Sequence, residues 1–286
     1  MLRVTACAVL ATLLLQPAPS KSGVLGLAHV RVATSDLKQA RRFYGELLGL
    51  PEIPWAGGGL ALYRVNDRQR IIVQQPFAPA ESEDRLLAMG WETADVAALQ
   101  RHVAGNAIET RELGERSDIG GRTIETQDPD GHRIQFVQRI GGGDWPFKDP
   151  DRRISQRILH AGVTIRDAAA ADSFYKDALG FGEIWRGGRP EGTINWINMR
   201  VPEGTDYLEY MLMTTKPDRR QLGTAHHIAL LVPDIQAALE TVRARTAADD
   251  PNHRSVPQIG VNRRWQLNVY DPDGTRVEFM EPWTAR

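Results

Sequence analysis

Cysteine is nearly missing from this chain of 286 residues, because Cys7 is the only one. Cys7 lies in an N-terminal segment that we expect to be removed, so the mature chain is predicted to hold no disulfide and no thiol nucleophile.

The chain also lacks an excess of charge of one sign, since the formal net charge is −1 and no long basic run occurs. Neither nucleic acid nor an anionic membrane surface is therefore a predicted partner.

Long apolar runs are missing as well, apart from residues 4–15, which are too short to cross a bilayer of about 20 helical residues. Arg3 precedes this run, and a segment rich in proline and small residues follows it. That order is typical of a secretory signal peptide, which we place at residues 1–22 with cleavage between Ala18 and Ser22. The alternative, a buried N-terminal helix, is disfavoured by Pro17 and Pro19. We expect an exported protein, periplasmic or secreted, with no membrane segment in its mature form.

An internal repeat is present in what remains. Residues 27–50 and 158–181 align without a gap at a shift of 131 positions, which places His29 on His160 and Asp36 on Asp167. Each copy starts with alternating apolar residues, as in a strand, and continues with a capping aspartate and apolar residues at helical spacing. Gly49 and Gly180 follow where a helix is predicted to end in the left-handed conformation.

A second pair of similar segments lies at another offset. Residues 127–138 (QDPDGHRIQFVQ) match residues 270–281 (YDPDGTRVEFME), and each reads as a tight turn followed by a strand. The chain therefore divides into four units, each with a strand, a helix and further strands. We predict an N-terminal domain at residues 23–140, a linker rich in glycine and proline at 141–156, and a C-terminal domain at 157–286. Periodicity alone indicates an α+β fold with antiparallel sheets.

Four such units, with a histidine early in the first strand and a carboxylate after a DPDG turn, resemble the vicinal oxygen chelate superfamily. This superfamily contains glyoxalase I, fosfomycin-resistance proteins, methylmalonyl-CoA epimerase and type I extradiol dioxygenases. The resemblance covers nearly all of the mature chain. It implies four βαβββ modules paired into two cup-shaped sheets, mixed or antiparallel, of the glyoxalase/dioxygenase-like fold. It also implies one divalent metal ion per cup, with ligands from the first and last strands of each unit.

The capping aspartates locate the ligand positions in this sequence. His29 and His160 each precede a capping aspartate by seven residues, and the same count back from Asp234 gives His227, not His226. The C-terminal half then offers four candidate metal ligands: His160, Glu209, His227 and Glu278. Glu209 is assigned through PEGTDYLEY, which has one residue more than the DPDG segments.

The N-terminal half offers a poorer set. It holds His29, Gln74 or Gln75, Ala88 and Gln135 at the corresponding positions. Two imidazoles and two carboxylates suit Zn²⁺, Fe²⁺, Ni²⁺, Co²⁺ or Mn²⁺, whereas one imidazole with neutral amides does not. We therefore predict one divalent metal ion, in the C-terminal half, and a degenerate first site.

Each candidate also has a plain structural interpretation. A lone histidine in a strand is usually a hydrogen-bonded core or surface residue, which is how we interpret His29. His226 is predicted to face away from the site, as a surface residue or a support for a ligand. Glu209 and Glu278 alternate with apolar residues, so each is expected to point inward, where a carboxylate without a partner is costly.

Three functions remain open. The first is a glyoxalase-like lyase, isomerase or epimerase that acts on a small substrate with vicinal oxygens through a metal-stabilised enediolate, with Glu209 or Glu278 as the base. The alternative is an Fe(II) extradiol-type dioxygenase, although the position ten residues before Glu278 holds Asn268 where that group carries a tyrosine. The third is a non-catalytic small-molecule-binding protein of the resistance type, which the intact ligand set argues against.

Overall fold

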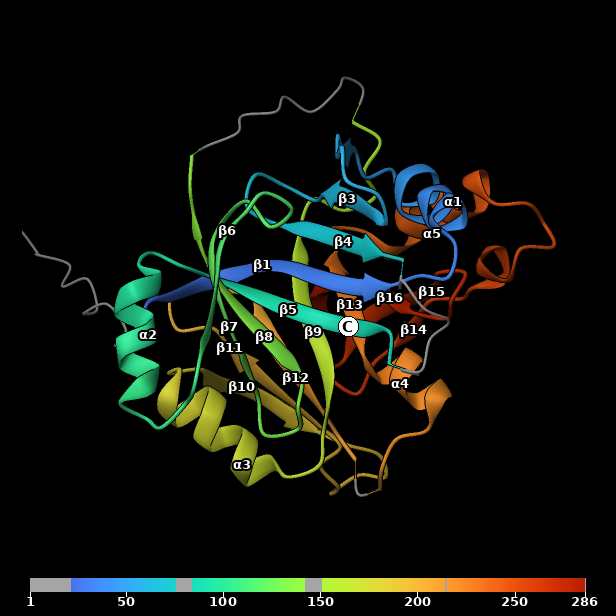
Figure 1. The fold of residues 1–286 in the computed structure, drawn as a ribbon. Helices are drawn as coiled ribbons and strands as arrows, with labels where there is room; N and C mark the ends of the chain where they lie inside the picture. The colour runs from blue at the N-terminus through green and yellow to red at the C-terminus, as the bar shows by residue number, and fades with distance from the viewer. Residues whose placement is uncertain (1–21, 76–83, 142–150, 214, 286) are drawn as a thin grey trace, which may run out of the picture.

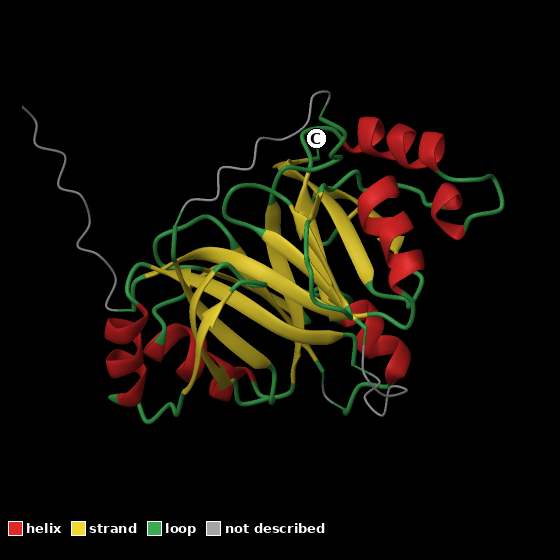
Figure 2. Cartoon of the chain, turned by 45° about the horizontal axis from the view of Figure 1, so that its top comes forward, coloured by secondary structure: helices red, strands yellow, loops and turns green. Residues whose placement is uncertain are grey.

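The structure is a computed structural model that describes residues 22–75, 84–141, 151–213 and 215–285. The predicted signal peptide therefore lies almost wholly outside the described residues. No helix in the described ranges is long and apolar enough to cross a membrane. Two eight-stranded sheets form the centre of the molecule, and the helices lie around them (Figures 1 and 2).

The first sheet has the strand order β2-β3-β4-β1-β5-β8-β7-β6. β1 pairs in parallel with β4, β5 pairs in parallel with β8, and β1 and β5 are antiparallel, so the sheet is mixed. Its strands are β1 (Val24–Ala33), β2 (Glu52–Ile53), β3 (Leu60–Arg64), β4 (Arg70–Gln74), β5 (Leu86–Thr93), β6 (Arg111–Arg116), β7 (Gly121–Gln127) and β8 (Arg133–Arg139).

The second sheet repeats this order as β10-β11-β12-β9-β13-β16-β15-β14. Each sheet thus holds two βαβββ units side by side, which confirms the predicted fold. Its strands are β9 (Ile158–Ile165), β10 (Gly182–Gly187), β11 (Trp196–Arg200), β12 (Tyr207–Leu212), β13 (His227–Leu231), β14 (Gln258–Ile259), β15 (Arg264–Tyr270) and β16 (Arg276–Thr284).

The helix of each unit starts at a capping aspartate. Asp36, Asp95, Asp167 and Asp234 each accept two backbone N–H groups from the first turn, which satisfies donors that a helix start leaves free. The helices are α1 (Leu37–Ala40), continued by the π-helix η1 (Arg41–Leu47), α2 (Val96–Ala104), α3 (Ala168–Asp172), continued by the π-helix η2 (Ser173–Ala178), and α5 (Ile235–Arg245). Two further helical segments, α4 (Arg219–Ala225) and the 3₁₀ helix η3 (Pro251–Arg254), lie outside the repeat.

Gly49 and Gly180 follow the two π-helices with φ of +73° and +76°. This is the left-handed conformation predicted at those helix ends.

Helices of one half pack beside helices of the other half. α1 lies beside α5, and α2 beside α3 (Figure 1). Arg245 of α5 donates to the Leu47 carbonyl at 2.8 Å, and the His102 ring contacts the Ala178 carbonyl at 2.7 Å. One large apolar cluster runs through both halves, because it contains residues of the first sheet such as Trp91 and residues of the second such as Phe279.

The two most recognisable repeat motifs meet across this contact between the halves. The buried Tyr175 hydroxyl donates to Asp128, in the DPDG turn of the first half, at 2.8 Å. The buried Tyr44 hydroxyl donates in the same way to Asp271, in the turn of the second half, at 3.0 Å. The DPDG turns therefore join the halves as well as starting strands β8 and β16.

Candidate metal centre

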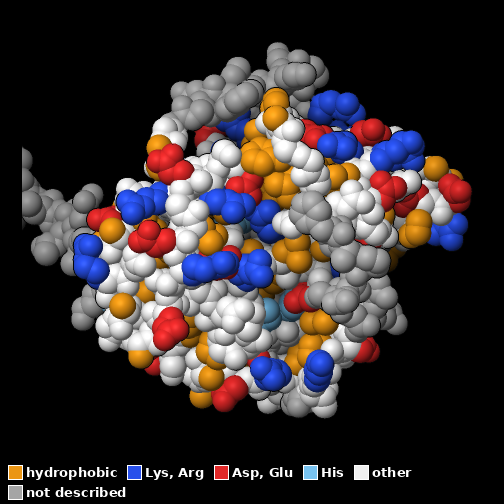
Figure 3. Space-filling view, viewed as in Figure 1, with side chains coloured by type: hydrophobic (Ala, Val, Ile, Leu, Met, Phe, Trp, Pro, Cys, Tyr) orange, Lys and Arg blue, Asp and Glu red, His pale blue; other side chains and the backbone are white. Residues whose placement is uncertain are grey.

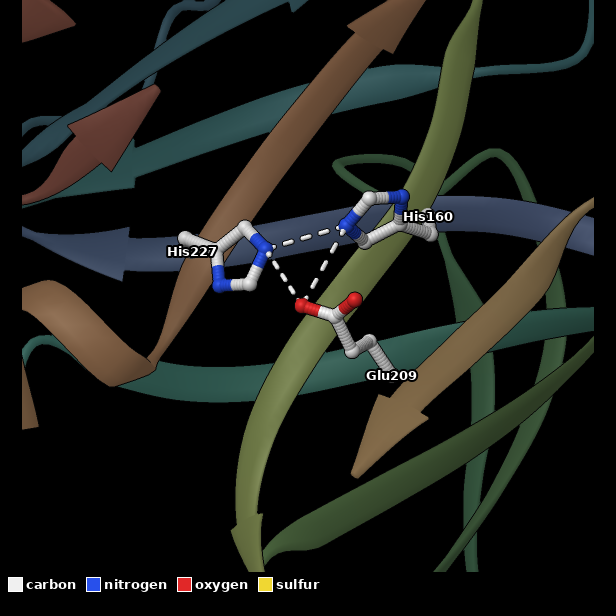
Figure 4. Close-up of side chains that lie close together, drawn as sticks. All are labelled: His160, Glu209 and His227. Atoms are coloured by element: carbon white, nitrogen blue, oxygen red, sulfur yellow. Dashed lines mark hydrogen bonds and ion pairs between the residues drawn. The ribbon is translucent and has the colours of Figure 1, made fainter. Parts of the chain in front are cut away.

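The four predicted ligand residues converge in the second half. His160, Glu209, His227 and Glu278 come from β9, β12, β13 and β16, which are four adjacent strands at the middle of the sheet. The Nε2 atoms of His160 and His227 lie 3.0 Å apart. The Oε2 atom of Glu209 lies 3.9 Å from His160 Nε2 and 3.4 Å from His227 Nε2. The Oε2 atom of Glu278 lies 3.6 and 3.5 Å from the same two nitrogens. Each carboxylate oxygen thus lies within 3.9 Å of both imidazole nitrogens. Figure 4 shows three of the four side chains, His160, Glu209 and His227.

The pairing register explains this convergence. Ala229 of β13 pairs with both His160 and Glu278, so those two side chains share a face of the sheet. Gly162 of β9 pairs with both Glu209 and His227, which brings the other two to the same face. A Cβ atom on Gly162 would lie 2.0 Å from the His227 ring, so the absence of a side chain there makes room for the imidazole.

Burial sets the protonation of the two histidines. Burial, the neighbouring His227 and Arg276 hold the pKa of His160 well below its usual value. Burial and the charge of Arg276 also lower the pKa of His227. Both imidazoles are therefore neutral at pH 7 and can offer a lone pair to a metal ion.

The two carboxylates respond to burial differently. Burial and the charge of Glu278 raise the pKa of Glu209 to about 8. Burial opposes ionisation of Glu278 too, but a hydrogen bond to His227 and the charge of Arg276 hold its pKa below the usual value. Two carboxylates that repel each other in a buried place gain from a cation between them.

The donor set fits a divalent metal ion. Neutral imidazole nitrogens and carboxylate oxygens together suit Zn²⁺ and the divalent ions of iron, nickel, cobalt and manganese. His160 and His227 would each provide Nε2, and Glu209 and Glu278 would each provide one oxygen.

A cavity of about 180 Å³ opens from Glu209 and Glu278. Strands β10, β11, β12, β14, β15 and β16 contribute to its walls, together with the loop at residues 260–262. A small molecule in this cavity can therefore reach the carboxylates of the predicted centre. Basic and acidic side chains are interspersed on the face shown in Figure 3, which shows no broad surface of one charge.

The first half carries a different set at the corresponding positions. His29 Nε2 lies 2.8 Å from the Gln135 amide oxygen, and Ala88 occupies the position of His227. The prediction of Gln74 or Gln75 as the counterpart of Glu209 is wrong. Arg31, two residues after His29, pairs with Ile72, just as Gly162, two residues after His160, pairs with Glu209. Ile72 is therefore the counterpart of Glu209, two residues before Gln74 and three before Gln75.

Arg31 fills the place that Gly162 leaves open in the second half. Its guanidinium donates to the Gln74 side chain at 2.9 Å and forms a close ion pair with Asp118. Burial and the charge of Arg31 lower the pKa of His29 to about 3. A cation fixed beside one neutral imidazole opposes the binding of a second cation, so the first half is not suited to a metal ion.

His226 is not the surface residue that we considered. It is buried, and its Nε2 atom lies 2.9 Å from the Thr164 hydroxyl, while its Nδ1 atom lies 2.6 Å from Asp84. His132, from the first half, packs edge-on against His226 and contacts Asp128 at 2.7 Å. These two rings therefore belong to the contact between the halves.

Sequence reasoning missed several side chains around the site. Arg276 Nη2 lies 2.8 Å from His227 Nδ1, and Tyr207 stacks on the His160 ring with centroids 4.4 Å apart. Asn198 pairs with Glu209 across strands, and Asn268 pairs with Glu278. The side-chain oxygens of both asparagines are buried without a hydrogen-bond partner among the described residues. The sequence could have indicated that Arg276 lies near the site. Arg276 is two positions before Glu278 in the same strand, so the two side chains share a face of the sheet.

Comparison with known proteins agrees with this architecture. Residues 26–136 and 157–279 match the Glyoxalase/Bleomycin resistance protein/Dioxygenase superfamily, and the chain belongs to this superfamily. A lactoylglutathione lyase of Haemophilus influenzae is 31% identical over 127 residues, which cover 44% of this chain and 92% of that protein. A metapyrocatechase of Pseudomonas sp. CF600 is 21% identical over 289 residues, which cover 91% of this chain and 87% of that protein.

Solved structures show the same fold. A 2,3-dioxygenase from Pseudomonas sp. KL28 superposes with a TM-score of 0.70 at 18% identity, over 92% of this chain and 93% of that chain. The likeness therefore extends over both halves of the molecule.

Proposed function

We propose that this protein is a metal-dependent enzyme that converts a small substrate with two neighbouring oxygens by moving a proton next to a carbonyl group. The convergence of two neutral imidazoles and two carboxylates beside an open cavity supports this proposal most directly. When bound, a divalent metal ion supplies a Lewis acid that polarises substrate oxygens. The reaction class is that of a glyoxalase-like isomerase, lyase or epimerase.

Glu209 is the base in this proposal. It lines the cavity, and its contact of 3.9 Å to His160 is the longest in the cluster, so it is the carboxylate most able to reach a substrate. Burial and the charge of Glu278 raise the pKa of Glu209 to about 8, and a divalent cation beside it would lower that pKa again and favour the ionised form. The carboxylate would then take a proton from the carbon beside the carbonyl, and the C–H electrons would form the double bond of an enediolate. Return of the proton to the neighbouring carbon would complete an isomerisation. Glu278, held by His227, would stay in place.

The experiment compares Glu209→Gln with Glu125→Gln under the same metal loading. Turnover of a panel of α-oxoaldehydes and their thiol adducts is measured per bound metal ion. Because a general base contributes roughly 10²–10⁴-fold, the rate of Glu209→Gln is expected to fall by about 100-fold or more. Glu125 lies in the first half, where it accepts from Gln135, so Glu125→Gln is expected to keep the rate. Equal rates in both variants would overturn the role of Glu209.

A second candidate is Fe(II) extradiol ring cleavage. The similarity to a metapyrocatechase favours it, because that similarity covers 91% of this chain and therefore both halves. Against it, Asn268 lies opposite Glu278, at the position where that group carries a tyrosine. The nearest tyrosine in the sequence, Tyr270, lies two residues further on and is 40% exposed. A catechol panel, added to Fe(II)-loaded protein before oxygen, separates the two candidates through the colour of ring-cleavage products. Metal-free protein that binds these molecules without turnover would instead indicate a binding protein.

We also propose that the protein is exported, on the signal-peptide pattern of residues 1–22. Ser22 is buried and donates to the Leu179 carbonyl at 2.5 Å, so cleavage just before Ser22 would retain this contact. N-terminal sequencing of protein from the periplasm or culture medium tests this. A mature N-terminus at residues 19–22 is expected, and an intact Met1 in the cytosolic fraction would contradict export.

A further inference from the structure

The cavity beside the predicted metal centre has an apolar wall. Trp185, Trp196 and Met211, from β10, β11 and β12, line one side. Ile259 of β14 and Val261, in the loop between β14 and β15, also line the cavity. Indole rings offer broad flat surfaces, so this wall suits a flat apolar body better than a flexible polar chain.

The ionisable residues that line the same cavity are balanced in number. Arg189 and Arg276 are cationic, and Glu209 and Glu278 are acidic, so their ionised charges sum to zero. A divalent metal ion held by the two glutamates leaves two positive charges in excess. Arg189 is exposed, so solvent screens its charge, whereas Arg276 is half-buried in the cavity wall. The excess of positive charge favours a ligand of opposite sign, which here is an anion.

Arg276 is the cation best placed to receive such an anion. Its Nε atom is buried without a hydrogen-bond partner in the part of the chain that the structure describes. Its Nη2 atom lies 2.8 Å from His227 Nδ1, yet the same Nδ1 lies 2.8 Å from the Ala225 carbonyl. One Nδ1 atom cannot both accept from Arg276 and donate to Ala225.

Metal binding would determine whether His227 Nδ1 pairs with Arg276 or with the Ala225 carbonyl. A histidine that ligates through Nε2 keeps its proton on Nδ1 and donates it to a nearby carbonyl, here that of Ala225. Arg276 then loses its acceptor on His227. The guanidinium would have both its Nη2 and its Nε hydrogens to offer to another group in the cavity.

We propose that the substrate is a small, flat organic acid whose carboxylate binds Arg276 while its body lies against Trp185 and Trp196. This inference rests on the proposed function, since the metal ion creates the charge excess. The cavity volume of 180 Å³ lies below the range of about 300–1,000 Å³ that accommodates drug-sized ligands, so the substrate is small.

The test uses Zn²⁺-loaded protein and two probes, catechol and 3,4-dihydroxybenzoate. Both carry vicinal oxygens, zinc supports no redox turnover, and only the second probe has a carboxylate. Isothermal titration calorimetry measures both dissociation constants. Because a hydrogen bond to a charged group is stronger than a neutral one, 3,4-dihydroxybenzoate is expected to bind about 10-fold more tightly than catechol.

Three variants show whether Arg276 is responsible. Arg276→Gln is expected to bring the ratio of the two constants close to one, whereas Arg276→Lys keeps part of the preference. Arg133→Gln is the matched control, because Arg133 holds the corresponding position after the first DPDG turn and lies in the first half. It is expected to keep the full preference. Zinc content and thermal unfolding of each variant separate a loss of anion binding from a loss of metal or fold.

Two results would overturn the inference. The first is a ratio near one in the native protein, and the second is an unchanged ratio in zinc-loaded Arg276→Gln. Either would leave the proposed function standing if the native protein takes up zinc. Failure of the native protein to take up any divalent metal would overturn the proposed function and this inference together.

Discussion

His226 and His227 are neighbours in the sequence, but their side chains have different surroundings. His227 points to the centre that it shares with His160, whereas His226 contacts Thr164 and Asp84. The difference arises because His227 is the first residue of strand β13, whereas His226 is the C-cap of the preceding helix α4.

Replacing these two histidines one at a time tests the assignment. His227→Ala is expected to weaken divalent-metal affinity by more than about 100-fold. Substitution of a residue that only hydrogen-bonds to a metal ligand already lowers metal affinity by about 10–100-fold, and loss of a ligand should cost more. His226→Ala is expected to keep the metal and lose about 1–2 kcal/mol of unfolding free energy with its hydrogen bonds. Competition with a chromophoric chelator measures the affinity. Equal metal affinity in both variants would show that the assigned register is wrong.

His29 makes stability depend on pH. Its pKa is about 3 in the folded protein against 6.5 for an exposed histidine, so below pH 6.5 the unfolded chain binds a proton that the folded chain does not. The stability contributed above pH 6.5 is therefore lost as the pH falls toward 3. Between pH 6 and 4, the native protein should lose about 2.5 kcal/mol more than His29→Gln, because the slope approaches about 1.4 kcal/mol per pH unit only well below pH 6.5. Urea unfolding at several pH values measures this, and parallel curves for both proteins would contradict it.

At the scale of strands, two glycines make space for two histidines. A Cβ on Gly162 would lie 2.0 Å from the His227 ring, and a Cβ on Gly90 would lie 2.0 Å from the His29 ring. Gly162→Ala and Gly90→Ala should therefore both destabilise the fold by roughly 1–3 kcal/mol through overpacking. Only Gly162→Ala should also weaken metal binding, because only His227 is a proposed ligand. A metal affinity that is unchanged in Gly162→Ala would argue against that role.

The tyrosines that bind the DPDG turns connect elements of the two halves. Tyr175→Phe and Tyr44→Phe each remove a buried hydrogen bond to an aspartate, so each should cost about 1.5–3 kcal/mol of unfolding free energy. Tyr207→Phe is the control, because within the described residues its hydroxyl makes only a weak contact of 3.6 Å with the sulfur of Met280. Chemical unfolding should rank Tyr207→Phe as the mildest change. A larger loss in Tyr207→Phe would mean that the turn contacts do not hold the halves together.

At the scale of the molecule, much of the fold could be predicted from the sequence because the repeat is read directly from residue types. The capping aspartates and the histidine positions fall at equal intervals, and the register preserves these intervals in space. The sequence did not reveal that Ile72 is the counterpart of Glu209. The first half has no DPDG turn before β4 that would mark the start of that strand.

Contacts between the two halves could not be predicted from the sequence either. His226 and His132 lie 94 positions apart in the chain, and their packing depends on how the two sheets meet. Arg31 was overlooked for a similar reason, since its effect on the first site comes from an ion pair with the distant Asp118. The repeat thus identifies the equivalent positions, whereas the surroundings of each position depend on tertiary packing.

The central claim is that one divalent metal ion binds between His160, Glu209, His227 and Glu278 in the second half. An anomalous difference map, recorded at the absorption edge of the loaded metal, tests this most directly. A single peak is expected at about 2.0–2.3 Å from the Nε2 atoms of His160 and His227. A map from fully loaded crystals with no peak at these residues, or with its main peak beside His29, would contradict the claim.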